Sequence, residues 1–230
     1  MKTVFFDLDD TLYSRCDAFF IAVEKFFCIK DECKKSQLCT FCRMRGDEVF
    51  FKAQRGEITN AQMYAYRFTK GFSDAGISIT EKEALEFQSV YQKELYSLKL
   101  SESVIKMLDF AKNKFDALGI ITNGPQEHQW NKIKKLNLEK WFSKNLIFVS
   151  GEYKIDKPDS RLFLLAQERA QKKSEDLIFV GDSFYNDILP ASKLKWHTIW
   201  LNLYDEKMIP PEHSCNTVNE ECSGGIIFSS

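Results

Sequence analysis

The chain has 230 residues, of which 44% are hydrophobic and 28% are charged. These values are ordinary for a globular protein and allow one domain with a smaller accessory part. The 32 basic and 33 acidic residues leave a net charge of −1, which excludes a strong field for nucleic acid or anionic lipid. No apolar stretch approaches the ~20 residues that span a bilayer, and acids interrupt the N-terminal apolar run at once, unlike a signal peptide. We therefore expect a cytoplasmic protein that binds neither a membrane nor a nucleic acid polymer.

Five short apolar runs, each bounded by polar or turn residues, predict buried β-strands. They are Val4–Leu8, Ala117–Thr122, Leu146–Ser150, Leu177–Gly181 and Thr198–Leu201. Strands separated by helices indicate a parallel sheet that is covered on both faces.

Three helical patterns separate the last four strands. They cover Pro125–Leu136, Pro158–Ala170 and Asn186–Lys193. In the first, Trp130, Ile133 and Leu136 are expected on one face, and the basic run 132–135 is interpreted as a solvated helix face.

The stretch between the first two strands has almost no strand pattern and is too long for one crossover helix. It predicts four helices, marked by the spacing of Phe19, Ala22, Val23 and Phe26 and by the segments Val49–Ala53, Ala61–Phe68 and Ala84–Leu95. We expect a helical subdomain at 15–98 inserted into a core made of 1–14 and 99–230. Ser101 is the expected N-cap of the helix that returns the chain to the core.

The chain has seven cysteines, Cys16, Cys28, Cys33, Cys39, Cys42, Cys215 and Cys222. Cys39 and Cys42 form a CxxC motif, which is compatible with a zinc site or a redox pair. The preferred interpretation is that the cysteines are reduced and pack as small apolar side chains, because no second CxxC or His pair completes a ligand set. The polar end, Asp205 to Ser230, is interpreted as a trailing surface segment.

The segment Asp7-Leu8-Asp9-Asp10-Thr11 ends the first strand with three acids in four positions. Strands favour apolar and β-branched residues, and adjacent carboxylates repel each other. Asp7 and Asp9 are expected to share a side because strand side chains alternate. One carboxylate can attack phosphorus while the other exchanges a proton with the leaving oxygen and with water.

Three further motifs lie at the ends of predicted strands or in the loops beyond. Thr122-Asn123-Gly124 ends the second strand with a hydroxyl and a turn that can hold phosphoryl oxygens. Lys157 precedes Pro158 and has the reach to enter a neighbouring site. Gly181 removes side-chain bulk near this site, and Asp182 and Asp187 add oxygen ligands of the kind that Mg²⁺ prefers.

Taken in order, these four motifs resemble those of the haloacid dehalogenase-like hydrolase superfamily over nearly the whole chain. The resemblance implies a Rossmann-like α/β core with strand order 3-2-1-4-5 and an α-helical cap of subfamily I inserted after the first motif. It implies Asp7 as the nucleophile, Asp9 as the general acid/base, and Thr122 and Lys157 as catalytic groups that bind the transferring phosphoryl group. Backbone contacts from Asn123 and Gly124 would complete the phosphate site. The implied cofactor is Mg²⁺, held by Asp7, the Asp9 backbone carbonyl and Asp182, with Asp187 assisting through water or by fixing Lys157.

Asp9 separates the reactions within this superfamily, because a halide leaving group needs no proton whereas an ester oxygen does. A phosphatase that acts on a small phosphorylated metabolite through an aspartyl-phosphate is therefore expected. A phosphosugar mutase and a non-catalytic phosphate-binding module are the alternatives. The sequence leaves open which nucleotide, sugar phosphate or other ester is the substrate, and it leaves open the oligomeric state. The many aromatic residues of the insert are interpreted as its own core.

Overall fold

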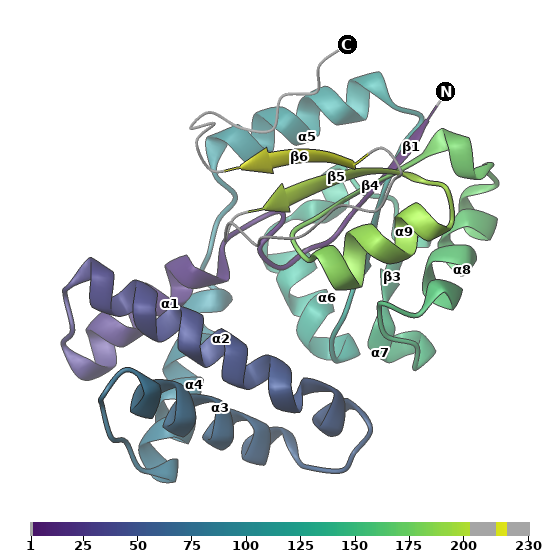
Figure 1. Cartoon of the computed structure of the whole chain (residues 1–230). Helices are drawn as coiled ribbons and strands as arrows, with labels where there is room; N and C mark the ends of the chain where they lie inside the picture. Colours follow the sequence, from purple (N-terminus) through teal and green to yellow (C-terminus); the bar gives the residue numbers. More distant parts are fainter. Residues whose placement is uncertain (1, 203–214, 220–230) are drawn as a thin grey trace. The chain divides into compact units, whose positions relative to one another are not determined.

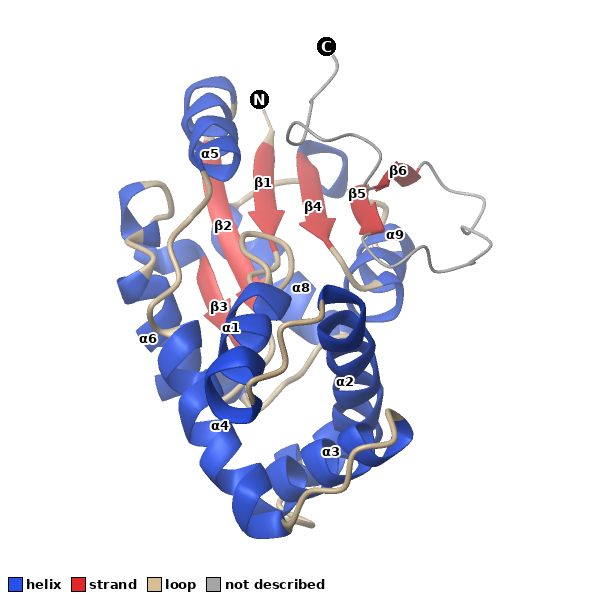
Figure 2. Cartoon of the chain, turned by 90° about the vertical axis from the view of Figure 1, so that its left-hand side faces the viewer, coloured by secondary structure: helices blue, strands red, loops and turns tan. Residues whose placement is uncertain are grey.

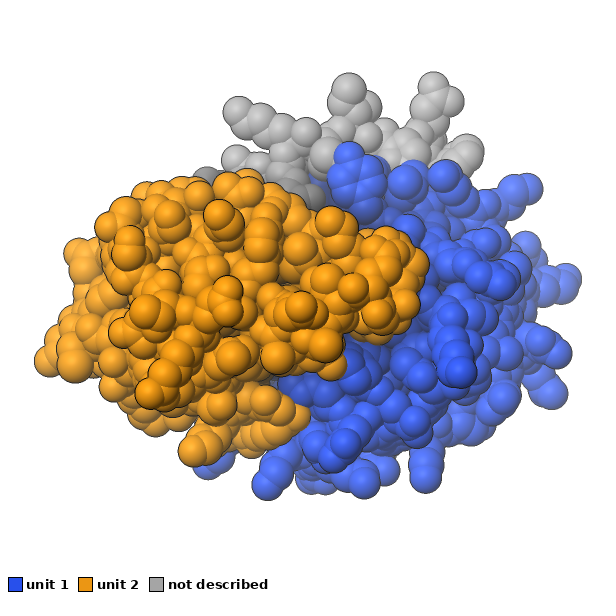
Figure 3. All heavy atoms as spheres, turned by 90° about the horizontal axis from the view of Figure 1, so that it is seen from below, with its two compact units in different colours: residues 1–14, 99–230 blue, residues 15–98 orange. Residues whose placement is uncertain are grey.

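A computed structural model describes residues 2–202 and 215–219 of the chain. The chain divides into two compact units, Met1–Ser14 with Lys99–Ser230 and Arg15–Leu98, coloured separately in Figure 3. We call them the core unit and the helical unit. Most of the stretch 205–230, with Cys222, lies outside the described residues.

The core unit is built on a parallel sheet with strand order β3-β2-β1-β4-β5-β6 (Figure 2). The strands are β1 (Thr3–Phe6), β2 (Ala117–Thr122), β3 (Ile147–Val149), β4 (Leu177–Gly181), β5 (His197–Asn202) and β6 (Cys215–Asn219). All five predicted strands and the implied order 3-2-1-4-5 are confirmed. The sixth strand was not predicted, since the polar end gives no apolar run, and it lies parallel to β5.

Successive side chains of the central strand β1 point to opposite faces of the sheet. Because Phe5 and Phe6 are both apolar, β1 contributes apolar side chains to both faces. The Phe5 ring contacts Trp196 at a centroid distance of 5.5 Å, and the Phe6 ring contacts Phe142 edge-on at 5.8 Å. Helices α8 (Ser160–Ala170) and α9 (Leu189–Lys193) contribute Leu162, Phe163 and Ala191 to the same cluster as Phe5. The buried central position of β1 fixes where the chain leaves the sheet.

The remaining helices of the core unit connect these strands (Figure 1). They are α5 (Glu102–Lys114), α6 (Gln126–Lys135) and α7 (Ser150–Tyr153), the 3-10 turns Leu138–Lys140, Lys144–Leu146 and Ser174–Asp176, and a π-helical turn at Phe184–Ile188 that leads into α9. The predicted N-cap is confirmed, because Ser101 Oγ accepts a hydrogen bond from the Val104 amide.

The helical unit contains α1 (Arg15–Phe27), α2 (Glu32–Gln54), α3 (Asn60–Asp74) and α4 (Glu81–Leu95). Thr59 and Thr80 close capping boxes that begin α3 and α4. The core of the unit is aromatic: the Phe87 ring packs edge-on against Phe68 and Phe19, at centroid distances of 4.9 and 5.5 Å. The aromatic residues therefore pack against one another, as the sequence analysis expected.

The preferred interpretation of the cysteines is wrong for two of them. Cys16 of α1 and Cys39 of α2 form a disulfide, whereas Cys28, Cys33 and Cys42 are free. The CxxC residues are not paired with each other, and burial raises the pKa of the Cys42 thiol to about 12. Across residues 2–202 and 215–219, no helix is both long and apolar enough to cross a bilayer.

Gly71→Ala tests the close packing of α2 on α3. A Cβ at position 71 would lie 2.7 Å from Cys42 Cα and 2.8 Å from its amide nitrogen, backbone atoms of α2 that cannot turn away. Overpacking of this kind costs about 1–3 kcal/mol, more than the ~1 kcal/mol by which Ala favours a helix over Gly. We expect Gly71→Ala to lower the free energy of unfolding, measured by denaturant titration.

Gly46→Ala in α2 is the matched control. A Cβ there would meet only the flexible Arg67 side chain, at 3.2 Å from Cδ, so helix propensity should decide and stability should be unchanged or higher. Equal stabilities for the two variants would contradict the packing described here.

Candidate active site

The predicted site residues come together at one edge of the sheet in the core unit. Asp7 follows β1, Thr122 ends β2 and Asp182 follows β4. Because β2 and β4 are the parallel neighbours of β1, the carboxyl ends of all three strands meet at this edge, where open α/β sheets bind ligands.

Lys157 joins two of the carboxylates. It lies between α7 and α8, and its Nζ is 2.6 Å from both Asp7 Oδ1 and Asp187 Oδ1. All three side chains are buried. A buried charge is tolerated when it is paired and hydrogen-bonded, so the ammonium and the carboxylates stabilise one another's charged forms.

Asp182 completes a buried acidic cluster. Among the described residues, Asp7, Asp182 and Asp187 are the group whose carboxylate oxygens, one from each, lie within 4.8 Å of one another and could hold a metal ion. Gly181 makes room for this cluster, since a Cβ there would lie 2.6 Å from Asp187 Cγ. A larger residue at position 181 would therefore displace Asp187, which agrees with the expectation that this glycine removes side-chain bulk near the site.

The cluster has the composition of a magnesium site. Its donors are all carboxylate oxygens, the hard ligands that Mg²⁺ prefers. Three buried carboxylates lie together here, so a divalent cation would bring compensating charge. The residues present therefore fit the implied Mg²⁺ ion, with Asp7 and Asp182 as ligands and Asp187 next to them.

The protein groups alone strongly perturb the ionisation of the cluster. Burial above all, together with the carboxylates of Asp187 and Asp9, raises the pKa of Asp7 to about 7, although Lys157 acts to lower it. Burial lowers the pKa of Lys157, but Asp187 and Asp7 together outweigh it and leave that pKa above its ordinary value. The lysine therefore carries its positive charge throughout the neutral range.

The turn after β2 orients Lys157. The Asn123 side chain accepts from the Lys157 amide at 2.8 Å and donates to the Lys157 carbonyl at 2.9 Å. The Gly124 amide donates to Ser150 Oγ at 2.9 Å, so it would have to exchange this partner to bind phosphate. Thr122 Oγ1 accepts from Gln129 Nε2 at 2.6 Å.

The Asp9 carboxylate contacts side chains of α6. Lys132 Nζ donates to Asp9 Oδ1 at 2.8 Å and to Oδ2 at 2.9 Å. Gln129 Nε2 donates to Oδ2 at 3.0 Å, and the Tyr13 hydroxyl donates to Oδ1. Asp10 lies in the turn between Asp9 and Tyr13 and has a left-handed φ of 62°. Asp tolerates this conformation better than most residues.

The sequence analysis missed Gln129 and Lys132. Its solvated helix face is wrong for Lys132, which is buried, although Lys134 and Lys135 are exposed. Of the expected inner face, Ile133 and Leu136 are buried and Trp130 is half-buried, but Gln129 and Lys132 are buried as well, so the inner face is wider than expected. The available signal was a polar pair at i and i+3 next to an apolar residue at i+4, which apolar periodicity does not count.

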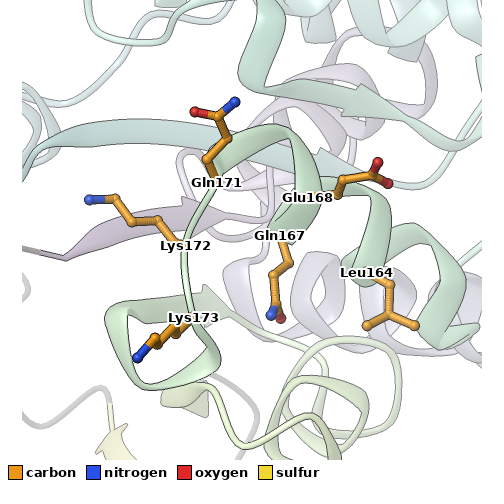
Figure 4. Close-up of a pocket in the computed structure, with 6 residues that line it drawn as sticks. All are labelled: Leu164, Gln167, Glu168, Gln171, Lys172 and Lys173. Atoms are coloured by element: carbon orange, nitrogen blue, oxygen red, sulfur yellow. The ribbon is translucent and has the colours of Figure 1, made fainter.

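A separate depression of about 400 Å³ lies near the end of α8 (Figure 4), lined by Leu164, Gln167, Glu168, Gln171, Lys172 and Lys173. Two of its polar side chains have partners within the fold: Lys172 pairs with Asp116 at 2.7 Å, and Gln167 Oε1 accepts from Trp196 Nε1 at 2.9 Å. None of the predicted site residues lines it.

Comparison with known proteins defines the class. The family of haloacid dehalogenase-like hydrolases matches residues 1–194. A glyceraldehyde 3-phosphate phosphatase of Methanocaldococcus jannaschii is 26% identical over 95% of this chain and 93% of its own. A glyceraldehyde 3-phosphate phosphatase of Pyrococcus furiosus is 35% identical over a segment that covers 36% of this chain and 33% of that relative.

The fold agrees with this assignment. A haloacid dehalogenase-type hydrolase of Bacillus subtilis, solved with bound magnesium, superposes with a TM-score of 0.69 at 23% identity and covers 94% of this chain and 93% of its own. The chain belongs to the haloacid dehalogenase-like hydrolase family. The resemblance and the hydrolase class inferred from the motifs are therefore confirmed.

Lys157→Met tests the electrostatics of the cluster. Breaking a buried ion pair by removing one partner costs about 3–5 kcal/mol because it leaves an uncompensated charge. With a chelator present, we expect a loss of this size in the free energy of unfolding at pH 8. Without Lys157, Asp7 of the native variant should stay protonated above pH 7, whereas Asp7 of wild type is ionised there. The loss should therefore grow as pH rises above about 7, the pKa of Asp7 in wild type, and shrink as pH falls to that value.

The control is Lys154→Met, which removes an exposed lysine three residues earlier and should leave stability almost unchanged. A pH-independent difference between wild type and Lys157→Met would show that Lys157 does not stabilise the ionised form of Asp7.

Proposed function

We propose that this chain is a Mg²⁺-dependent phosphomonoester hydrolase that acts on a small phosphorylated metabolite through an aspartyl-phosphate at Asp7. The observation that carries the proposal is the buried contact of Lys157 with Asp7 and Asp187 beside Asp182, with a separate acid, Asp9, two residues from Asp7. The names of the relatives support the reaction type, since they include phosphatases of glyceraldehyde 3-phosphate, phosphorylated carbohydrates and phosphoserine.

In the first half-reaction, an Asp7 carboxylate oxygen forms a bond to phosphorus as the bond from phosphorus to the ester oxygen breaks. Asp9 gives its proton to the departing oxygen, so the alcohol leaves uncharged. Lys157 opposes the negative charge of the phosphoryl oxygens, and the hydroxyl of Thr122 donates to one of them.

In the second half-reaction, water attacks the phosphorus of the aspartyl-phosphate. Asp9, now a carboxylate, takes the proton of that water, and the bond from Asp7 to phosphorus breaks to release phosphate and restore the Asp7 carboxylate. Both half-reactions thus use the same two acids in different roles.

Mg²⁺ bound by Asp7, Asp182 and the Asp9 backbone carbonyl would supply positive charge to the phosphoryl oxygens. Asp187 supports the site by holding Lys157. The Asn123 side chain also holds Lys157, through hydrogen bonds to the Lys157 backbone. The backbone amides of Asn123 and Gly124 are the further phosphate donors in this proposal.

We assign the helical unit, 15–98, the role of an α-helical cap that excludes water during phosphoryl transfer. Two arginines of this unit that could otherwise bind an anionic substrate group have acidic partners: Arg45 pairs with Asp74 at 2.7 Å and Arg55 pairs with Glu57. We propose a small phosphate ester as the substrate class. Three-carbon phosphates are the first candidates to test, followed by nucleoside monophosphates and sugar phosphates.

The test is a panel of phosphorylated metabolites assayed for phosphate release with and without Mg²⁺. The panel includes glyceraldehyde 3-phosphate, phosphoserine, nucleoside monophosphates and a bisphosphosugar. Mg²⁺-dependent release from one class supports the proposal. Isomerised sugar without free phosphate would identify a mutase instead, and no turnover of any ester, including a generic aryl phosphate, would favour a binding module.

Asp7→Asn should abolish turnover while the fold survives. Asparagine is nearly isosteric with aspartate but is a far weaker nucleophile. Steady-state phosphate release measures the loss, and thermal unfolding with the same midpoint region as wild type verifies the fold. Wild-type rates in this variant would exclude the covalent mechanism.

Asp9→Asn should lower kcat/KM for an alkyl phosphate by about 10²–10⁴-fold, the usual contribution of a positioned acid or base. The loss should be much smaller for a dinitrophenyl phosphate, whose phenolate leaves without a proton. Equal losses for both esters would argue against Asp9 as the proton donor.

A further inference from the structure

We infer that Lys132 is a positioning residue for Asp9, and that with Gln129 it orients the Asp9 carboxylate for its role as the base in the second half-reaction. The inference rests on the proposed function and deepens it, because it adds two residues of α6 to the machinery around Asp7.

The geometry of the contact is the first observation. Lys132 Nζ donates to both oxygens of Asp9, at 2.8 and 2.9 Å, so the ammonium lies astride the carboxylate and restricts its rotation. The lysine side chain is 4% exposed and that of Asp9 is 14% exposed. A pair this shielded from water is held more firmly than a surface ion pair.

The position of Lys132 on its helix is the second observation. The inner face of α6 consists of Gln129, Lys132 and Ile133, where packing alone would favour apolar residues. Burying a polar or charged side chain is unfavourable unless it finds a partner. Both polar residues of this face find the same partner, Asp9.

Gln129 links Asp9 to the end of β2. Its Nε2 lies 3.0 Å from Asp9 Oδ2, 2.6 Å from Thr122 Oγ1 and 2.8 Å from the Asn123 carbonyl oxygen. Gln129 therefore holds the Asp9 side chain in a fixed position relative to Thr122, the residue proposed to bind the phosphoryl group.

The set of donors matches the ionised form of Asp9. Lys132, Gln129 and the Tyr13 hydroxyl all donate to its oxygens, and a carboxylate is an acceptor at both oxygens. The form that accepts is the form that takes a proton from water when the aspartyl-phosphate is hydrolysed. Proton transfer is sensitive to small misplacements of the base. Lys132 prevents such a misplacement of Asp9.

The test uses a dinitrophenyl phosphate, an ester whose departure needs no proton. For this substrate kcat/KM reports transfer to Asp7, whereas kcat reports hydrolysis of the intermediate when that step is slow. We expect Lys132→Met to lower kcat by about 10–100-fold, the usual effect of removing a supporting partner, and to lower KM in parallel, so that kcat/KM stays close to that of wild type.

Rapid mixing gives an independent readout. Lys132→Met should release a burst of dinitrophenol close to one equivalent of enzyme before slow turnover, because the phosphorylated enzyme accumulates. In an Asp9→Asn background, adding Lys132→Met should cause no further loss in kcat, since the residue acts through Asp9.

Lys134→Met, an exposed lysine on the same helix, is the matched control and should behave like wild type. Lys132→Arg should retain more of kcat than Lys132→Met, because a guanidinium also donates to two carboxylate oxygens. If Lys132→Met does not fold, Lys132→Gln, which keeps an N–H donor, should show the same division between kcat and kcat/KM.

The outcomes separate the inference from the function on which it rests. Loss of kcat/KM as large as the loss of kcat would identify a structural role, and unchanged kcat would show no role at all; either result overturns the inference while the phosphatase proposal stands. Wild-type protein that releases no phosphate from any ester would overturn the proposed function, and the inference with it.

Discussion

The contact of Lys157 with two buried aspartates is the interaction on which the rest of the site depends. Asp7 and Asp187 lie far apart in the sequence, and the ammonium lies 2.6 Å from an oxygen of each. Such a charge cluster is unfavourable away from water unless its geometry is held closely. The fold holds it by pairing β1 between β2 and β4 and by fixing the Lys157 backbone through Asn123. Both devices serve to place charge at one edge of the sheet.

Much of this arrangement is predictable from the sequence, and the reasons are physical. Strands buried on both faces read as apolar runs, so β2 (Ala117–Thr122) and β4 (Leu177–Gly181) were predicted with the observed bounds. Acids that directly follow such runs have no role in folding, which drew attention to Asp7 and Asp182. The sixth strand has no apolar run and could not be found in this way. The pairing of Cys16 with Cys39 likewise depends on how α1 and α2 pack, which spacing along the chain does not determine.

The environment of Asp9 shows where reasoning from patterns ends. A basic run on an amphipathic helix is usually solvated, and two of its three lysines are exposed as expected. Lys132 differs because α6 turns it toward a carboxylate from the first loop, 123 positions away in sequence. Only the three-dimensional structure brings these two charges together. Two of the three acids of the first motif therefore have different partners: Asp7 belongs to the acidic cluster with Lys157, whereas Asp9 belongs to a network with Lys132 and Gln129. This division matches the separate tasks proposed for them, nucleophile and proton carrier.

The central claim is that Asp7 forms a covalent bond to phosphorus. It is tested most directly by borohydride trapping, which reduces an aspartyl-phosphate to homoserine, followed by mass spectrometry of the N-terminal peptide. The account predicts homoserine at position 7 when a turned-over phosphate ester and Mg²⁺ are both present, and none when the ester is omitted. An active protein whose Asp7 stays unmodified under these conditions, or one that is modified at a different residue, would contradict it.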